Sequence, residues 1–265
     1  DTGTVYVSLN GYRFDDFSPY LYRSQDFGKS WQDLSGALPH EPINVVREDP
    51  ENPEVLYVGT DHALYVSLDG GATFMGLFKD MPHAPVHDLV VHPRDKDVVV
   101  GTHGRSIYIA NVEHVQQLTQ EMLAKTLHVF PVESVNHSDF WGRMRSSFSE
   151  AFEPETEIAF YVDRDVTATV RVKTADGLVL AEFSDASEHG LNYVPYKLTV
   201  DSTKAGSYEN ALRAAASAGE KFKPYKAADN GKFYLRPGTF TVEVTASGVT
   251  ASEKLEVKAR ERRGR

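Results

Sequence analysis

The sequence predicts an all-β protein in which about the last two and a half blades of a β-propeller are followed by a second β-rich domain. Two observations predict the propeller. An eleven-residue turn is written twice, 43 residues apart, and strand-forming segments recur at the same spacing. A repeat of about 40–50 residues that is rich in strand formers is typical of a propeller blade. Short alternating strands in the C-terminal half predict the second domain.

The repeated turn spans residues 21–31 and 64–74, and both copies read aromatic-x-Ser-x-Asp-x-Gly-x-Ser/Thr-aromatic. An Asp side chain accepts hydrogen bonds from backbone amides two or three residues on, and the glycine tolerates a positive φ. We expect the final aromatic to pack under the hairpin and bury a large area. The turn is therefore interpreted as structural, through Ser24, Asp26, Gly28 and Trp31 in the first copy and Ser67, Asp69, Gly71 and Phe74 in the second.

The repeat extends beyond the turn. Val58-Gly59-Thr60 recurs as Val100-Gly101-Thr102, and Leu64-Tyr65 recurs as Ile107-Tyr108. A third, degenerate copy begins at Val5 and is interrupted by an insertion over residues 11–19. Residues 1–113 therefore supply the predicted blades.

These turns resemble the Asp-box, or BNR repeat, which occurs in sialidases, xyloglucanase-type glycoside hydrolases, sortilin-type receptors and a photosystem II assembly factor. The resemblance implies a propeller with the box at the blade periphery, and it implies no activity. Residues 19–24, 48–50, 56–61 and 101–109 resemble the last blades of large bacterial secreted proteins that are sortilin-like or labelled as glycosyl hydrolases. That resemblance implies a secreted, periplasmic or bacterial cell-surface location, including an outer-membrane complex.

The predicted domains follow from these patterns. Seven short strands with regular turns, one of them at Asp176-Gly177, favour an immunoglobulin-like (Ig-like) sandwich, and they resemble the module of the flagellar hook-cap protein. The expected order is propeller blades over 1–113, a linker with a short helix and a strand over 114–156, the Ig-like β-sandwich over 157–259 with an inserted loop over 202–231, and a basic tail over 260–265. A closed propeller needs about four to eight blades. We therefore expect the remaining blades to come from a longer polypeptide or from a separate chain.

Composition excludes several classes of function. The 28 basic and 38 acidic residues give a formal net charge of −10, which argues against a nucleic-acid partner. Cysteine is absent, and no apolar run is long enough for a transmembrane segment. His87 and His92 invite a metal interpretation, but a separation of five is expected to place them on opposite faces of a strand. We expect no metal, no cofactor and no catalytic set in these residues.

Two groups of residues are candidates for binding. Asp61-His62 and His103-Gly104-Arg105 occupy equivalent turns between strands, where propellers tend to bind partners. The alternative is a salt bridge or a turn cap between neighbouring blades. The inserted loop with Tyr12 and Arg13 is aromatic and charged like many recognition loops, and its alternative is a routine difference in loop length.

The first functional hypothesis is a non-catalytic binding or assembly protein that uses a propeller face to bind a protein, a peptide or a glycan. The alternative is a sialidase- or xyloglucanase-like glycoside hydrolase whose acid and base lie in other blades, because Asp15 and Asp16 on one loop do not give the geometry of two facing carboxylates. A third hypothesis is a scaffold that closes the ring and attaches it to a neighbour.

Overall fold

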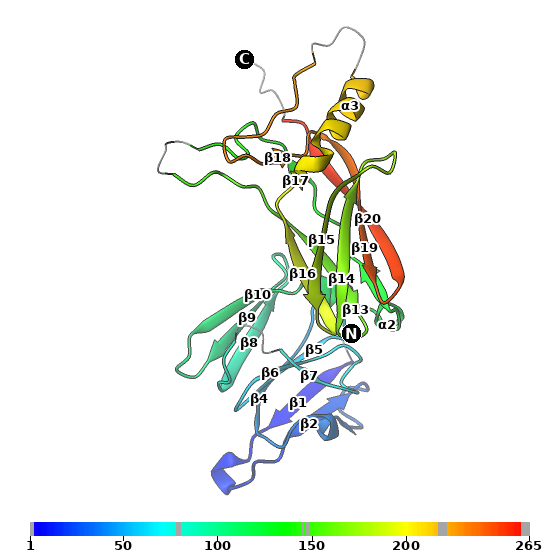
Figure 1. Ribbon diagram of the computed structural model, residues 1–265. Helices are drawn as coiled ribbons and strands as arrows, with labels where there is room; N and C mark the ends of the chain where they lie inside the picture. The colour runs from blue at the N-terminus through cyan, green and yellow to red at the C-terminus, as the bar shows by residue number, and fades with distance from the viewer. Residues whose placement is uncertain (1–2, 78–80, 145, 147–148, 217–221, 261–265) are drawn as a thin grey trace. The chain divides into compact units, whose positions relative to one another are not determined.

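The computed structural model describes residues 3–77, 81–144, 146, 149–216 and 222–260. The chain divides into two compact units, unit 1 over Asp1–Glu121 and unit 2 over Met122–Arg265 (Figure 1). No helix in the described ranges has the length and apolar character needed to cross a membrane. Most of the predicted basic tail, residues 261–265, lies outside the described residues.

The strands described in unit 1 form three antiparallel sheets in sequence order. The first contains β1 (Val5–Leu9), β2 (Tyr20–Ser24) and β3 (Gln32–Asp33); the second contains β4 (Ile43–Glu48), β5 (Leu56–Thr60), β6 (Leu64–Ser67) and β7 (Met75–Gly76); the third contains β8 (Val86–His92), β9 (Asp97–Thr102) and β10 (Ile107–Asn111). Short helices connect or follow them: η1 (Tyr12–Phe14), η2 (Ser35–Ala37), α1 (Glu113–Gln117) and α2 (Gln120–Leu123).

The sequence repeat is also a repeat of backbone geometry. β4 pairs with β5 through a register shift between Ile43 and Val45, and β8 pairs with β9 through the same shift between Val86 and Asp88. The extra residues of these two bulges, Asn44 and His87, therefore occupy equivalent positions. By the same correspondence, β2, β6 and β10 are equivalent strands.

Hydrogen bonds within the repeated turns explain their sequence. Asp26 accepts from the amides of Lys29 at 3.0 Å and Ser30 at 2.8 Å, three and four residues on. Ser24 Oγ accepts from the amide of Gly28, which has a φ of 82°. Because the carboxylate oxygens accept several donors, the pKa of Asp26 falls to about 2, with the Ser30 hydroxyl as the largest cause.

The second turn repeats this arrangement. Asp69 accepts from the amide of Thr73 at 2.9 Å, and Ser67 Oγ accepts from the amide of Gly71 at 2.8 Å. The expected burial of the closing aromatic is wrong for Trp31, which is 46% exposed and lines a shallow hollow with Val7 and Tyr22. The equivalent Phe74 is half-buried against the apolar cluster of the first two sheets. The difference arises because Phe74 has a neighbouring sheet to pack on, whereas the face around Trp31 is open.

Apolar side chains fill the space between successive sheets of unit 1. One cluster joins the first sheet to the second and includes Leu21, Ile43 and Leu56. Between the second and third sheets, Gly59 lies so close to its neighbours that an added Cβ would stand 2.5 Å from Val86 Cγ1 and 2.7 Å from Val45 Cγ1. The glycine is therefore required by close packing rather than by a turn.

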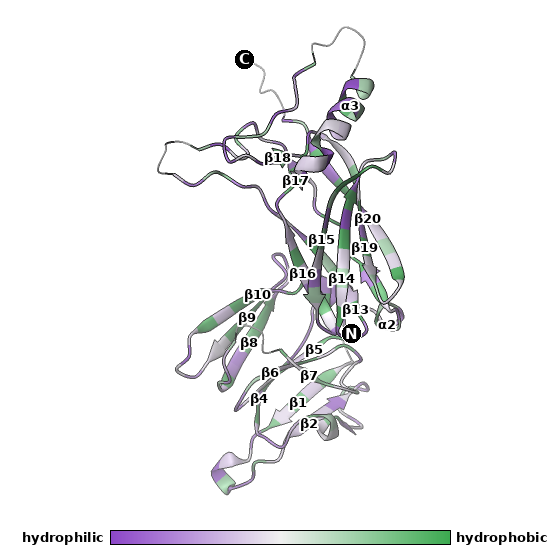
Figure 2. Ribbon diagram, in the orientation of Figure 1, coloured by the Kyte–Doolittle hydropathy of each residue, from purple (hydrophilic) through white to green (hydrophobic). Residues whose placement is uncertain are grey.

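Unit 2 contains two larger sheets around one core. The first has the order β11 (Leu127–Val129), β13 (Thr156–Val162) and β16 (Gly190–Tyr196); the second has the order β12 (Val135–Asn136), β20 (Val249–Lys258), β19 (Gly238–Ala246), β14 (Val166–Lys173) and β15 (Val179–Ser187). A small ladder pairs β17 (Thr199–Val200) with β18 (Phe233–Tyr234). Hydrophobic residues follow the long strands in Figure 2, and alternate residues such as Val170, Val172 and Val242 are fully buried in the core.

The structure divides the predicted linker over 114–156 between the two units. α1 follows β10 within unit 1. β11 pairs with β13, and β12 pairs with β20, so both strands belong to the sheets of unit 2. Trp141 lies in the core of unit 2, whereas Phe140 and Phe152 of the same segment are exposed.

The predicted insertion over 202–231 begins with η3 (Ser202–Lys204) and α3 (Ala205–Ala215). Tyr208 and Tyr225 are buried with their ring centroids 5.1 Å apart, and the Tyr225 hydroxyl donates to the Tyr234 carbonyl at 2.9 Å. The described part of the insertion is therefore packed onto the core of unit 2.

Candidate functional site

Three equivalent connections of unit 1 lie at the same end of their sheets. Residues 10–19 connect β1 to β2, residues 61–63 connect β5 to β6, and residues 103–106 connect β9 to β10. We call these three connections the loop end; the repeated Asp turns leave β2 and β6 at the opposite end. All six predicted binding residues lie at the loop end, namely Tyr12, Arg13, Asp61, His62, His103 and Arg105.

The first connection presents aromatic side chains. η1 starts where the Tyr12 amide donates to Asn10 Oδ1 at 3.1 Å, and Arg13 Nε donates to the Tyr12 hydroxyl at 3.1 Å. The Arg13 guanidinium also lies 5.8 Å from the centre of the Tyr12 ring. Phe14, which was not among the six predicted binding residues, is 87% exposed. Its signal in the sequence is its place beside Tyr12 and Arg13 in an aromatic and charged loop.

The Asp16 carboxylate stabilises the first connection. Asp16 accepts from the Tyr20 hydroxyl at 2.5 Å and from the Ser18 amide at 3.0 Å. These donors favour the charged form, and the Tyr20 hydroxyl is the largest cause of a lowered Asp16 pKa. Asp16 therefore holds the loop onto β2, while Asp15 caps η1 in the left-handed region with a φ of 57°.

The second connection is tied to the first through Asn44, the bulge residue of β4. Asn44 Nδ2 donates to Asp61 Oδ1 at 2.9 Å, and Asn44 Oδ1 accepts from Asn10 Nδ2 at 2.8 Å. The Asp61 amide donates to the Pro42 carbonyl at 3.2 Å. The chain Asn10–Asn44–Asp61 thus joins the loop ends of the first two sheets, as expected for a turn cap between neighbouring blades.

His62 forms a pair with Glu41 within the second repeat. Its Nδ1 lies 2.5 Å from Glu41 Oε2, and the Tyr65 hydroxyl donates to Glu41 Oε1 at 2.9 Å. The Glu41 side chain is only 7% exposed, whereas that of His62 is 70% exposed. Burial, and then the hydrogen bond to Glu41, raise the pKa of Tyr65 to about 12. The buried Glu41 therefore orients His62, and the outer edge of the His62 ring faces solvent.

The third connection repeats the backbone of the second with different side chains. The His103 amide donates to the Pro85 carbonyl at 2.8 Å, as Asp61 does to Pro42. Where the second repeat has the Asn44–Asp61 hydrogen bond, the third has His87 and His103 with their ring centroids 5.2 Å apart. Arg105 is exposed, and its guanidinium makes no hydrogen bond or ion pair with any part of the chain that the structure describes.

The expectation that His87 and His92 lie on opposite faces of a strand is wrong. The bulge between Val86 and Asp88 shifts the alternation of β8, so both histidines are exposed while Leu89 and Val91 are buried. The described residues contain no group of three or more His, Cys, Asp or Glu side chains that could hold a metal ion.

A chain of hydrogen bonds through Asn10 and Asn44 thus joins Tyr12 and Arg13 to Asp61. His62, next to Asp61 in the sequence, forms its own pair with Glu41. His103 and Arg105 occupy the equivalent place in the next repeat. Within the described residues, no hydrogen bond joins the 61–63 turn to the 103–106 turn. The loop end can therefore offer aromatic, cationic and imidazole groups to a partner, held by buried or half-buried acids.

The family described as "Sortilin, neurotensin receptor 3" (Sortilin-Vps10) matches residues 20–178, which is more than half of the chain. None of the curated proteins compared with the chain matches it significantly.

Three solved structures are similar over most of the chain. A xyloglucanase of glycoside hydrolase family 74 from Xanthomonas campestris is 11% identical over 97% of this chain and 37% of its own, with a TM-score of 0.35. The extracellular domain of a putative hybrid two-component system from B. thetaiotaomicron is 9% identical over 97% and 30%, with a TM-score of 0.33. An ancestral enzyme of family 74 is 14% identical over 95% and 29%, with a TM-score of 0.33. The chain spans about a third of the length of these proteins.

Proposed function

Because the chain belongs to the sortilin–Vps10 family, we propose that unit 1 is part of a β-propeller whose loop end binds a partner macromolecule without catalysis. In this proposal unit 2 is an Ig-like sandwich that acts as a spacer or a dock. The setting is extracellular: the protein is secreted, periplasmic or on a bacterial cell surface, within an outer-membrane or other surface complex. No cofactor takes part.

The observation that carries the β-propeller in this proposal is an exposed apolar face on each of the two outer sheets of unit 1, the first and the third. On the first sheet, Val5, Val7 and Leu9 alternate along β1 and face solvent wholly or in part, beside Tyr22 and Trp31. On the third sheet, Val90, Val99 and Ile109 lie opposite one another across β8, β9 and β10.

The equivalent surfaces between the sheets of unit 1 are packed, whereas Val90 is 56% and Ile109 is 66% exposed. Contiguous exposed apolar area of this kind marks an interaction surface. In this proposal further blades cover it, either in the same longer chain or in a separate one, because the repeated sheets of unit 1 pack face to face.

The loop end supports binding rather than hydrolysis. Three of its carboxylates are engaged within the protein, namely Asp16 by Tyr20, Glu41 by His62 and Asp61 by Asn44, while Asp15 is exposed. The groups that remain exposed are Tyr12, Phe14 and Arg105 among others. Aromatic residues and arginine are enriched in protein–protein interfaces, and this favours a protein or peptide partner over a glycan.

Site-specific photo-crosslinking in the natural, full-length protein tests the proposal. The phenylalanine analogue benzoylphenylalanine is placed at Phe14 or at Arg105 of the loop end. The matched control places it at Phe27, which is also exposed but lies in the turn at the opposite end of β2. We expect one discrete adduct at the first two positions and none at Phe27. Adducts at Phe27 alone, or the same adducts at all three positions, would contradict a binding face at the loop end.

A further inference from the structure

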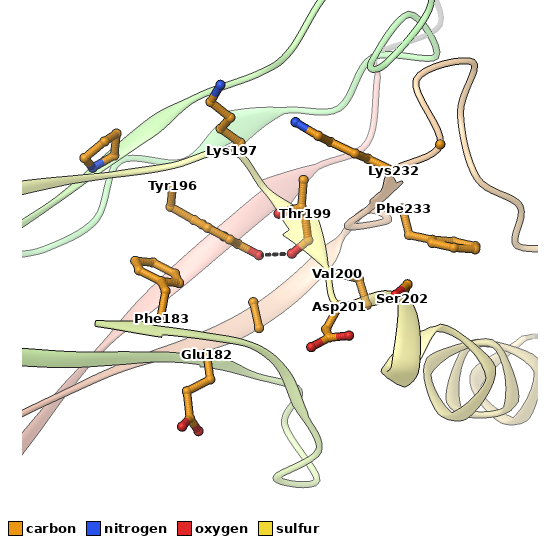
Figure 3. A pocket seen from close by; sticks show the side chains of 13 residues that line it. Glu182, Phe183, Tyr196, Lys197, Thr199, Val200, Asp201, Ser202, Lys232 and Phe233 are labelled. Atoms are coloured by element: carbon orange, nitrogen blue, oxygen red, sulfur yellow. Dashed lines mark hydrogen bonds between the residues drawn. The ribbon is translucent and has the colours of Figure 1, made fainter. Parts of the chain in front are cut away.

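A separate cleft in unit 2 has the features of a small-ligand site. It has a volume of about 590 Å³ and lies between β15 and β16, with the β17–β18 ladder at one end (Figure 3). Small-molecule pockets generally measure about 300–1,000 Å³ and combine an apolar wall with a few polar groups. The residues used below are Phe183 and Tyr196, Lys197 and Lys232, and Asp201 and Ser202.

The wall of the cleft is a fixed aromatic ring. Phe183 is stacked on Tyr196, with centroids 5.7 Å apart and ring planes 18° apart. Tyr196 is 3% exposed, and its hydroxyl donates to the Thr199 carbonyl at 2.6 Å. Burial and this hydrogen bond hold Tyr196 in place, and the half-buried Phe183 ring packs on it beside the cleft. A flat ring held in this way presents a π face to a ligand.

Most charges at the rim are neutralised within the protein. Lys197 donates to Glu153 at 2.7 Å, and Lys232 donates to the same carboxylate. The hydrogen bond from Lys197 is the largest cause that lowers the pKa of Glu153 to about 2, so the carboxylate stays charged. Glu182 points away in Figure 3 and pairs with Arg171 at 2.7 Å. A ligand with a net charge would find few unpaired charges here.

Some polar groups of the cleft can form further hydrogen bonds. Asp201 Oδ1 accepts from both the amide and the hydroxyl of Thr203, each at 2.8 Å, whereas its Oδ2 has no partner among the described residues. The Thr203 amide is the largest cause that lowers the Asp201 pKa, so this acceptor is ionised at neutral pH. Lys197 and Lys232 point away from Phe183 and Asp201 in Figure 3, so Asp201 is the charged group available to a ligand on this side. The hydroxyl of Ser202 lies beside Asp201 in the cleft.

The cleft is poorly suited to an added β-strand. Pro195 lies on β16 and has no amide hydrogen to donate, and exposed acidic residues follow the edge of β15 at Glu182 and Asp185. Proline and charge are the usual means by which a sheet edge resists pairing with another chain. A small ligand fits this cleft better than a peptide strand.

We propose that this cleft binds one neutral sugar residue of a glycan. The apolar C–H face of a pyranose would stack on Phe183, since the π face of an aromatic ring attracts weakly positive hydrogens. Its hydroxyls would donate to Asp201 Oδ2. This inference concerns unit 2 alone and does not depend on the loop end of unit 1.

Saturation-transfer NMR on the full chain tests the inference, with three neutral probes: cellotetraose, mannotetraose and chitotetraose at millimolar concentration. We expect transfer to the ring protons of at least one probe. Phe183→Leu, which keeps an apolar side chain but loses the ring, should abolish it. Asp201→Asn keeps the cap of η3 but loses the charge, and it should weaken binding about tenfold. The matched control Phe140→Leu, at an exposed aromatic of unit 2 outside the cleft, should have no effect.

Three results would overturn the inference: no transfer to any of the three probes, transfer that Phe183→Leu leaves unchanged, or transfer that Phe140→Leu removes equally. The third result would place the sugar elsewhere on unit 2. Preserved near-ultraviolet circular dichroism in each variant separates loss of binding from loss of folding.

Discussion

Asn44 donates a hydrogen bond to Asp61 over 2.9 Å, and in the next repeat the equivalent positions hold His87 and His103 with their rings 5.2 Å apart. The backbone places the bulge residue of β4 or β8 against the turn at the loop end in both repeats. The two repeats thus share a position but differ in its chemistry, which is a half-buried polar link in one and an exposed pair of rings in the other. This is how a repeated scaffold provides different surface groups at one end of its sheets.

Asn44→Ala should destabilise unit 1 by about 1–2 kcal/mol, because it removes the link to Asp61 and leaves the Asn10 amide without its acceptor. His87→Ala at the equivalent exposed site should change stability by less than about 0.5 kcal/mol. Urea unfolding of both variants, followed by tryptophan fluorescence, gives the comparison. Equal losses would mean that the hydrogen bond makes no net contribution.

Gly59→Ala should destabilise the chain by about 1–3 kcal/mol, because the new methyl group would overlap Val86 and Val45 between the second and third sheets. Gly101 is the equivalent glycine of the third sheet, and an added Cβ there meets only the Asp88 carbonyl oxygen at 3.5 Å. Gly101→Ala should therefore be close to neutral in the isolated chain. Thermal unfolding of the two variants measures the difference.

The Gly59→Ala and Gly101→Ala variants also test whether a further blade packs on the third sheet. If a further blade packs on the third sheet, Gly101→Ala should become about as costly as Gly59→Ala in the complete natural protein. A Gly101→Ala variant that remains neutral there would argue against a blade in that position.

Asp69→Ala should cost about 1–3 kcal/mol, since the Thr73 amide, the Thr73 hydroxyl and the Ser67 hydroxyl lose their common acceptor. Crosslinking from the loop end should be unchanged, because this turn lies at the opposite end of β6. Glu51→Ala, at an exposed acid of the same unit, is the control for loss of charge. A loss of crosslinking without a loss of stability would contradict the structural role of the turn.

The Asp26 carboxylate should make the free energy of unfolding depend on pH in the acidic range. Its pKa is lowered from 3.8 to about 2 in the folded protein, so its contribution to stability is fully present above about pH 4 and is lost as the pH falls toward 2. The stability difference between wild type and Asp26→Asn should therefore be constant above pH 4 and shrink below it. Carbon-13 NMR titration of the Asp26 carboxyl group measures the pKa directly, and a value near 3.8 would refute the prediction.

Much of the fold could be predicted from the sequence, because the repeated residues form the same hydrogen bonds with the backbone in each turn. Asp26 and Asp69 act through their own turns, so their spacing alone predicts the hydrogen bonds. The exposure of Trp31 and the shared exposure of His87 and His92 could not be read in the same way. The first depends on whether another sheet covers the hollow beside Val7, and the second depends on a bulge that has no signature of its own at Val86-His87-Asp88.

The candidate site was predicted in position but not in its contacts. Tyr12, Asp61 and His103 were placed in surface turns by the strand pattern. The contacts over longer range depend on strand pairing: Asn44 on β4 joins Asn10 to Asp61, and Glu41 lies against His62. The cleft beside Phe183 was not predicted, because it forms between two strand edges that belong to different sheets.

The central claim is that further blades cover the exposed faces around Trp31 and Ile109. Its most direct test is the mass of the natural protein, measured by mass spectrometry under denaturing and then native conditions. We predict either a denatured mass well above the 29.5 kDa of this chain, or a native complex that contains a second, blade-bearing chain. A mass of 29.5 kDa under both conditions would contradict the claim, since both apolar faces would then be open to water in the natural protein.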